Sequence, residues 1–233
     1  MGISLAGANV AAAELPKPIR LLVVTGGHGF DKSFFDLFPA NPMWKWEHRA
    51  HREKSTSTVY ADAIANDFDV VLLYDMPQKI SEQEQRNFLD LFRLGKGVVV
   101  LHHALCSYQH WDTYNEIIGV KMRQDGDVTF PAFTFLHDVE FELKRLETNH
   151  PVLEGVSSFR VFDETYGRMF MDGGSEPLMM TNTATSIPMV VWARTYQLSR
   201  LVMIQPGHGP QIFHNPNFTR LLSNAVRWVA PRA

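Results

Sequence analysis

The chain has 233 residues, of which 45% are hydrophobic and 20% are charged, as in an ordinary globular protein. These values exclude a disordered chain, a coiled coil and a collagen-like repeat, and the length fits one large domain. Because 22 Lys and Arg stand against 25 Asp and Glu, the net charge is −3. The sequence therefore lacks the basic excess with which proteins bind nucleic acid, and we expect no nucleic-acid partner.

The cysteine count and the hydropathy exclude two further classes of protein. Cys106 is the single cysteine, so neither an intrachain disulfide nor a multi-cysteine zinc site can form. No apolar run approaches the roughly 18 residues needed to span a bilayer, and we expect no membrane partner.

Residues 1–18 are predicted to be an N-terminal tail, followed by a single domain over 19–233. Ile3 to Ala13 is small and apolar, and Ala11-Ala12-Ala13 before Glu14 is similar to a signal-peptidase site. The positively charged segment that should precede such a site is missing. The tail fits a trimmed export signal and a cytosolic extension equally, so localisation stays open between cytoplasm and periplasm or secretion.

The first half of the domain alternates predicted strands and helices. In chain order these are a strand at 19–24, a helix at 31–38, a weaker strand at 44–48, a helix at 57–66, a strand at 70–74, a helix from Ser81 to Gly95 and a strand at 97–101. The helix from Ser81 has the strongest signal, because Ser81 and Glu84 form a capping box. Short apolar strands joined by helices predict a doubly wound sheet whose central strands are buried on both faces.

The second half is richer in strands. From Phe133 to Leu143 apolar residues occupy every second position, which is the period of an antiparallel or edge strand with one wet face. Further strands are predicted at 159–162, 178–181, 189–193 and 200–204, and a terminal helix begins at Asn215 and Pro216. The pattern predicts an α/β domain with a mostly parallel central sheet and additional antiparallel strands.

Polar or glycine-rich sequence follows four of the predicted strands. These segments are Thr25-Gly26-Gly27-His28-Gly29, Asp75-Met76-Pro77, His102-His103-Ala104 and Gln205-Pro206-Gly207-His208-Gly209. Ligands of open parallel sheets bind beyond the carboxyl ends of the strands, and glycine lets a ligand approach the backbone. We therefore expect His28, His102 and His208 to meet at one edge of the sheet.

Two adjacent carboxylates, Asp163 and Glu164, form a second candidate feature. Neighbouring strand residues point to opposite faces, so at most one of them faces the crevice, while the other can hold backbone or orient a histidine. A carboxylate with His28, His102 and His208 could bind a divalent metal such as zinc. The same groups could also act without a metal as general acid and base.

The other candidate residues have a structural interpretation beside the functional one. Cys106 lies five residues beyond Leu101 without the frame of a nucleophile elbow, which favours a buried, inert thiol; the elbow position falls nearer His102. The segment 26–29 lacks the Gly-x-Gly-x-x-Gly spacing, so no nucleotide cofactor is expected. Trp111 and Tyr166 could stack on a sugar ring, with core packing as the alternative.

Two other histidine positions are interpreted as structural. His48 and His51 lie in a charged loop and are predicted to be exposed. His137 keeps the apolar parity of its strand, which favours a hydrogen-bonded core histidine.

Several segments, taken in order, carry a resemblance to a known family. They are Val24 to His28, Gly97 to Ala104, Trp111 to Gly119, His150-Pro151 with Gly155, Asp163 to Tyr166, Gly207-His208, and Asn217 to Trp228. From about Ile19 to Ala230 the sequence resembles the ThuA-like (trehalose utilisation) family, which is similar in fold to class I glutamine amidotransferases. The resemblance implies a flavodoxin-like three-layer sandwich and a role in sugar metabolism. It also implies that His102, Glu164 and His208 belong to the functional rim.

The chain departs from the family pattern in places. His103 stands where a small residue is usual, the segment 197–200 replaces a basic glycine-rich turn, and the loop 123–131 lacks a histidine expected there. The amidotransferase Cys-His-Glu triad does not carry over, since no cysteine stands at its elbow. Substrate identity and metal use therefore stay open.

The leading hypothesis is a carbohydrate-active hydrolase or lyase acting on a small glycoside or keto-sugar. His102, Glu164 and His208 are the expected catalytic residues. The expected substrate contacts are Gly27, His28, His103, Trp111, Asp163 and Tyr166. The alternatives are a non-catalytic sugar-binding or regulatory module and an amidohydrolase using Cys106. A sugar oxidoreductase as pathway partner and a homo-oligomeric state are compatible with this interpretation.

Overall fold

The computed structural model describes residues 17–39, 41–122 and 132–232, so most of the predicted tail and the loop 123–131 lie outside the described residues. Within these ranges a nine-stranded sheet has the order β2-β1-β3-β4-β11-β10-β9-β6-β7. Its strands are β1 (Ile19–Gly26), β2 (Trp44–Ala50), β3 (Val70–Asp75), β4 (Gly97–Leu101), β6 (Thr134–Arg145), β7 (Phe159–Gly167), β9 (Glu176–Met180), β10 (Met189–Tyr196) and β11 (Ser199–Ile204). The short strands β5 (Val120–Lys121) and β8 (Phe170–Met171) form a separate antiparallel pair.

The described helices comprise α-helices and short 3₁₀ turns. The α-helices are α1 (Glu82–Arg93), α2 (Asp112–Ile118), α3 (Pro210–Phe213) and α4 (Pro216–Val229). The 3₁₀ turns are η1 (Lys32–Leu37), η2 (Val59–Ala61), η3 (His102–Cys106) and η4 (Pro151–Leu153). None of the helices in the described ranges has the length and apolar character needed to cross a lipid bilayer.

The sheet is parallel on one side and antiparallel on the other. β2, β1, β3, β4 and β11 run parallel to one another, whereas β10, β9, β6 and β7 are joined by antiparallel pairing. The prediction of a mostly parallel sheet with additional antiparallel strands is confirmed.

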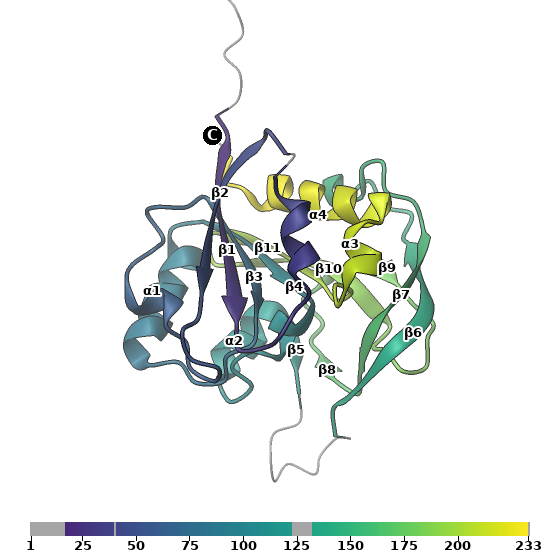
Figure 1. Cartoon of the computed structure of the whole chain (residues 1–233), viewed down its shortest axis with the longest axis horizontal. Coiled ribbons are helices and arrows are strands. Elements are labelled where there is room, and N and C mark those ends of the chain that lie inside the picture. The colour runs from purple at the N-terminus through teal and green to yellow at the C-terminus, as the bar shows by residue number, and fades with distance from the viewer. Residues whose placement is uncertain (1–16, 40, 123–131, 233) are drawn as a thin grey trace, which may run out of the picture.

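Helices cover both faces of the sheet, with α3 and α4 on one face and α1 and α2 on the other (Figure 1). Alternate residues of β1 show the division: Leu21 packs in the cluster that contains Leu221 of α4, and Leu22 packs with Leu91 of α1. Because both faces are covered, the central strands are buried throughout, which explains their continuous apolar sequence. The three-layer α/β sandwich is confirmed.

The predicted helix boundaries hold where a capping residue fixes them. Ser81 and Glu84 form the expected capping box of α1, and Asn215 caps α4 with Pro216 in its first turn. Asp31 likewise caps η1, although the helix there is a 3₁₀ turn. Local side chain to backbone bonds thus set these starts.

The helix predicted at 57–66 is wrong, because only η2 forms there. The N–H groups that would open the helix are bound elsewhere. The N–H of Ser57 donates to the carbonyl of Lys79 at 2.7 Å, and the N–H of Thr58 donates to His51 Nδ1 at 2.9 Å. Tertiary hydrogen bonds therefore override the local helical preference.

A β-bulge interrupts the pairing of β6 with β7. Leu136 pairs with Thr165 and Val139 pairs with Asp163, so two residues of β6 lie opposite one residue of β7. The extra residue reverses the face of the sheet to which the side chains before and after it point. The continuous alternation of buried and exposed side chains expected over 133–143 is therefore wrong. Phe135 is consequently 57% exposed, whereas Phe141 is 2% exposed.

Candidate functional site

The parallel strands bring the candidate residues to one edge of the sheet. β4 ends at Leu101 and continues directly into His102, and β11 ends at Ile204, its partner in the same register. The turn after β11 carries His208, and β7 adds Glu164. The structure thus brings together His102, Glu164 and His208, three residues that lie far apart in the sequence.

His102 is fully buried and has a strained backbone, with φ at +52°. Its Nδ1 lies 2.8 Å from the carbonyl oxygen of Gln205. Because a carbonyl oxygen only accepts hydrogen bonds, Nδ1 is the donor in this contact, and Nε2 is the atom turned toward the site. Nε2 lies 3.0 Å from Glu164 Oε2 and 3.4 Å from His208 Nδ1.

Glu164 is the anionic centre of the group. Its Oε2 accepts a hydrogen bond from the hydroxyl of Tyr166 at 2.9 Å and lies 3.1 Å from His208 Nδ1. Burial by itself raises the pKa of Glu164, but the hydrogen bonds from His102 and Tyr166 outweigh it and lower the pKa to about 2. The carboxylate is therefore ionised throughout the neutral range.

Asp163 holds backbone groups, which is one of the roles expected for the carboxylate that does not face the crevice. Its carboxylate accepts the backbone N–H groups of Glu164, Gly207 and His208. Burial raises the pKa of Asp163, and these N–H groups oppose that rise. The side chain of Asp163 thus fixes the backbone of the turn that carries His208. Asp163 and Glu164 point to opposite faces of the strand, as strand geometry requires.

The centre opens to solvent on the side of two half-exposed histidines. The side chain of His208 is 40% exposed, and that of His137 is 48% exposed. Burial and the proximity of His102 lower the pKa of His208, which keeps its imidazole neutral at pH 7.

His137 lies beside Glu164, a position that the sequence analysis did not predict. Its Nδ1 lies 3.6 Å from Glu164 Oε1, and its ring centroid lies 4.8 Å from that of His208. The expectation of a buried core histidine is wrong, because the bulge at residues 137 and 138 turns the side chain to the face of Glu164.

His28 lies beside the group rather than in it. Its ring packs 4.7 Å from that of His103, and its Nδ1 lies 2.6 Å from the carbonyl oxygen of Gly29. His103 is buried, with Nε2 3.2 Å from the carbonyl oxygen of Tyr74, and burial lowers its pKa well below the usual value. The structure thus places His28 and His103 outside the group of His102, Glu164 and His208, and a metal ligand role of His28 stays a prediction.

Three other residues expected to contact substrate fill structural positions. Gly27 has a φ of +80°, and a Cβ there would lie 2.5 Å from the carbonyl carbon of Met76. Trp111 packs its ring against Phe88 and other aromatic side chains of the α1–α2 layer. Tyr166 is 4% exposed and reaches the site only through its hydroxyl. Packing therefore explains the positions of Gly27 and Trp111, whereas Tyr166 donates a hydrogen bond to Glu164 from the buried side.

Cys106 is buried, as expected, and burial raises the pKa of its thiol. A protonated thiol without access to solvent is a poor nucleophile. The structure thus gives no support to an amidohydrolase mechanism through Cys106.

His51 is buried, which corrects the expected exposed position. Its Nε2 lies 2.8 Å from Asp75 Oδ2, and both side chains are almost without solvent contact. Asp75 is the last residue of β3 and His51 directly follows β2, so the pair ties the segment after β2 to the end of β3.

The group formed by His102, Glu164 and His208 has the composition of a metal site. One ligand atom from each residue lies within 4.8 Å of the others. Ligand atoms about 2.1 Å from a tetrahedral ion are about 3.4 Å apart, close to the 3.0, 3.1 and 3.4 Å found here. The bond from His102 Nδ1 to a carbonyl is the support that metal-binding histidines usually have. The donors therefore fit zinc or another divalent transition metal.

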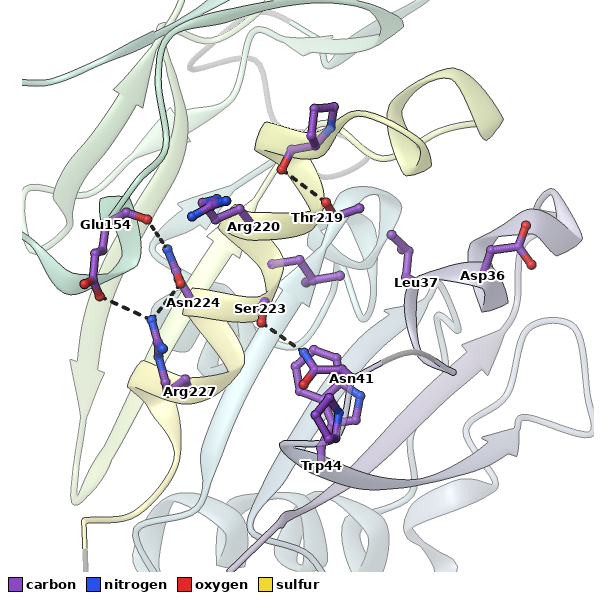
Figure 2. Close-up of a pocket in the computed structure, with 13 residues that line it drawn as sticks. Asp36, Leu37, Asn41, Trp44, Glu154, Thr219, Arg220, Ser223, Asn224 and Arg227 are labelled. Atoms are coloured by element: carbon purple, nitrogen blue, oxygen red, sulfur yellow. Dashed lines mark hydrogen bonds and ion pairs between the residues drawn. The ribbon is translucent and has the colours of Figure 1, made fainter. Parts of the chain in front are cut away.

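A hollow of about 710 Å³ lies elsewhere, between the start of β2 and α4 (Figure 2). Its polar side chains largely bond one another: Asn41 donates to Ser223, and Arg227 pairs with Glu154. None of the histidines described above lines this hollow. The reactive groups are thus at the sheet edge and not in the hollow.

Solved structures with the same fold include a ThuA-like protein from Parabacteroides merdae, with a TM-score of 0.77, 19% identity and 93% coverage of each chain. PurLQS from Thermotoga maritima gives a TM-score of 0.55 at 10% identity, over 91% of this chain and 99% of that one. A β-galactosidase from Bacillus circulans gives 0.60 at 8% identity, over 90% of this chain but 31% of the enzyme. At these identities the likeness shows the fold alone.

None of the curated proteins matches the chain in sequence. A family model does match, that of ThuA, described as trehalose utilisation, over residues 37–229. That range contains the ends of β4, β7 and β11, from which the site is built. The chain therefore belongs to the ThuA family.

Proposed function

We propose that the protein is a carbohydrate-active enzyme, a hydrolase or lyase that acts on a small glycoside or keto-sugar at the centre formed by His102, Glu164 and His208. The observation that carries the proposal is an ionised, buried carboxylate held between two imidazoles, one of which is open to solvent. The family description, trehalose utilisation, supports a sugar as the substrate.

The geometry divides the roles among the three side chains. His208 is half exposed and neutral, so its free nitrogen can accept a proton from a sugar hydroxyl or from water. Glu164, with a pKa of about 2, is too weak a base for that step at pH 7. It instead stabilises the imidazolium that forms on His208, 3.1 Å away. His102 fixes the orientation of the carboxylate from the buried side.

The same residues fit a divalent metal. His102 Nε2, Glu164 Oε2 and His208 Nδ1 would hold the ion. A bound divalent ion supplies Lewis-acid polarisation of a sugar oxygen. The chain's own groups would then bind and orient the substrate from the solvent side of the centre.

The test is turnover by the purified chain on a panel of glycosides and keto-sugars, with and without prior chelation. His208→Gln should lower kcat/KM about 10²- to 10⁴-fold, the range for loss of a general base. His110→Ala, a change at an exposed histidine outside the group, is the matched control. Full activity of His208→Gln overturns the proposal, and sugar binding by calorimetry without turnover points instead to a binding module.

A further inference from the structure

The bulge of β6 places His137 near Oε1 of Glu164. This is the carboxylate oxygen that does not contact His102, Tyr166 or His208. His102, Tyr166 and His208 all face Oε2 of Glu164. His137 Nδ1 faces Oε1 instead, at 3.6 Å. The centre therefore has a third imidazole on the opposite edge of the carboxylate.

The distance between His137 Nδ1 and Glu164 Oε1 is longer than a hydrogen bond and is compatible with two ligands of one ion. A hydrogen bond between nitrogen and oxygen is normally shorter than about 3.2 Å. Two ligand atoms bound to one tetrahedral zinc ion are about 3.4 Å apart, each about 2.1 Å from the metal. The 3.6 Å between His137 Nδ1 and Glu164 Oε1 is close to that spacing.

The backbone that delivers His137 is strained. Asp138 has a φ of +59°, which an L-residue other than glycine rarely adopts. Regular pairing would set one residue of β6 opposite Glu164, whereas the bulge sets His137 and Asp138 there. Strain of this kind persists where the surroundings impose it, often at functional sites.

We propose that His137 is a further ligand of a divalent metal centre with His102, Glu164 and His208, and that it approaches the ion from the solvent side. The inference rests on the same centre as the proposed function and adds one ligand on its solvent-facing side. His137 lies outside the group whose ligand atoms are within 4.8 Å of one another, so its half-exposed side chain has to rotate toward the ion. The resulting donor set of three imidazoles and one carboxylate suits zinc and neighbouring transition metals.

Calorimetric titration of the metal-free full chain with Zn²⁺ tests this inference. The wild type should bind one ion, and His137→Ala should bind it at least about tenfold more weakly, the loss of one ligand contact. His110→Ala serves as the control for adventitious binding at an exposed histidine, and Asp138→Gly keeps the bulge because glycine accepts its φ. Both controls should bind Zn²⁺ as the wild type does.

Visible absorption of the Co²⁺-loaded protein gives a second readout, because the band positions and intensities of Co²⁺ report its ligands. The spectrum should change in His137→Ala and stay the same in His110→Ala. Equal Zn²⁺ affinity and identical Co²⁺ spectra for the wild type and His137→Ala overturn the inference, as does a wild type that binds no Zn²⁺. Neither result decides the proposed function, because turnover of glycosides and keto-sugars is measured in a separate experiment.

Discussion

The buried carboxylate of Asp163 holds the backbone of His208, whose N–H lies 3.0 Å from Oδ1. The same carboxylate accepts the N–H of Gly207, while the hydroxyl of Tyr74 donates to the Gly207 carbonyl at 2.7 Å. The turn after β11 is thus fixed from both sides. The imidazole of His208 can be half exposed and still have a defined position, because the fold holds its backbone.

Asp163→Ala is expected to lower both stability and activity. The substitution leaves three N–H groups without their acceptor, two of them buried, and each buried one costs about 1–3 kcal/mol. Urea unfolding measures this loss, and kcat should fall with it because His208 is released. Asp62→Ala, at an exposed position, should change the unfolding free energy by less than about 0.5 kcal/mol. Unchanged stability of Asp163→Ala would show that water replaces the carboxylate.

Gly207→Ala should disturb the centre through direct contact with His102. An added Cβ would lie 3.0 Å from the Cβ of His102, and Gly207 has a φ of +151°. We expect a loss of about 1–3 kcal/mol from overpacking, together with lower activity. Gly29→Ala is the matched control, because nothing lies within 4 Å of a Cβ built there. A Gly207→Ala protein with wild-type kcat and Tm contradicts the packing argument.

Cys106 should be unreactive in the folded protein. Its side chain is 3% exposed, and burial raises the pKa of the thiol. A thiol reagent should label it only after the chain is unfolded in denaturant, and Cys106→Ala should keep the activity of the wild type. Rapid labelling of the native protein accompanied by loss of turnover would restore the cysteine mechanism.

His51 and Asp75 should contribute to stability as a buried pair. Removing one partner of such a pair leaves the other charge uncompensated, which costs about 3–5 kcal/mol. His51→Ala is therefore expected to lower the Tm by many degrees, measured by thermal unfolding. His110→Ala is the control and should unfold at the wild-type temperature. If His51→Ala also does so, the buried pair does not stabilise the fold by the expected amount.

The fold could be predicted from the sequence because its signals are local. Continuous apolar runs mark the central strands, and the capping residues Ser81 and Asn215 mark two helix starts. The helix prediction for 57–66 failed because the hydrogen bonds of this segment are not local. Its hydrogen bonds join residues distant in sequence, such as Ser57 with Lys79, and no local pattern records them.

The site could be predicted in part. The rule that ligands bind beyond the carboxyl ends of parallel strands correctly indicated the edge where His102 and His208 lie close together. It could not indicate His137, because one inserted residue reverses the faces of a strand. The polar pair His137-Asp138 within an apolar alternation was the available signal. Without a partner strand in view, nothing in the sequence shows that this pair forms a bulge.

The ionised state of Glu164 should appear in the acid stability of the protein. Its pKa in the folded chain is about 2, below the ordinary value of 4.5, because bonds from His102 and Tyr166 outweigh burial. A carboxyl group whose pKa is depressed by folding stabilises the protein above its unfolded pKa, and this contribution is lost as the pH falls through the folded value. Between pH 4.5 and about 2 the unfolding free energy of the wild type should therefore decline more steeply than that of Glu164→Gln. Urea unfolding of the metal-free proteins at several pH values measures both slopes, with Glu82→Gln, an exposed position on α1, as control. Parallel slopes for the wild type and Glu164→Gln would mean that the carboxylate is not held ionised by its neighbours.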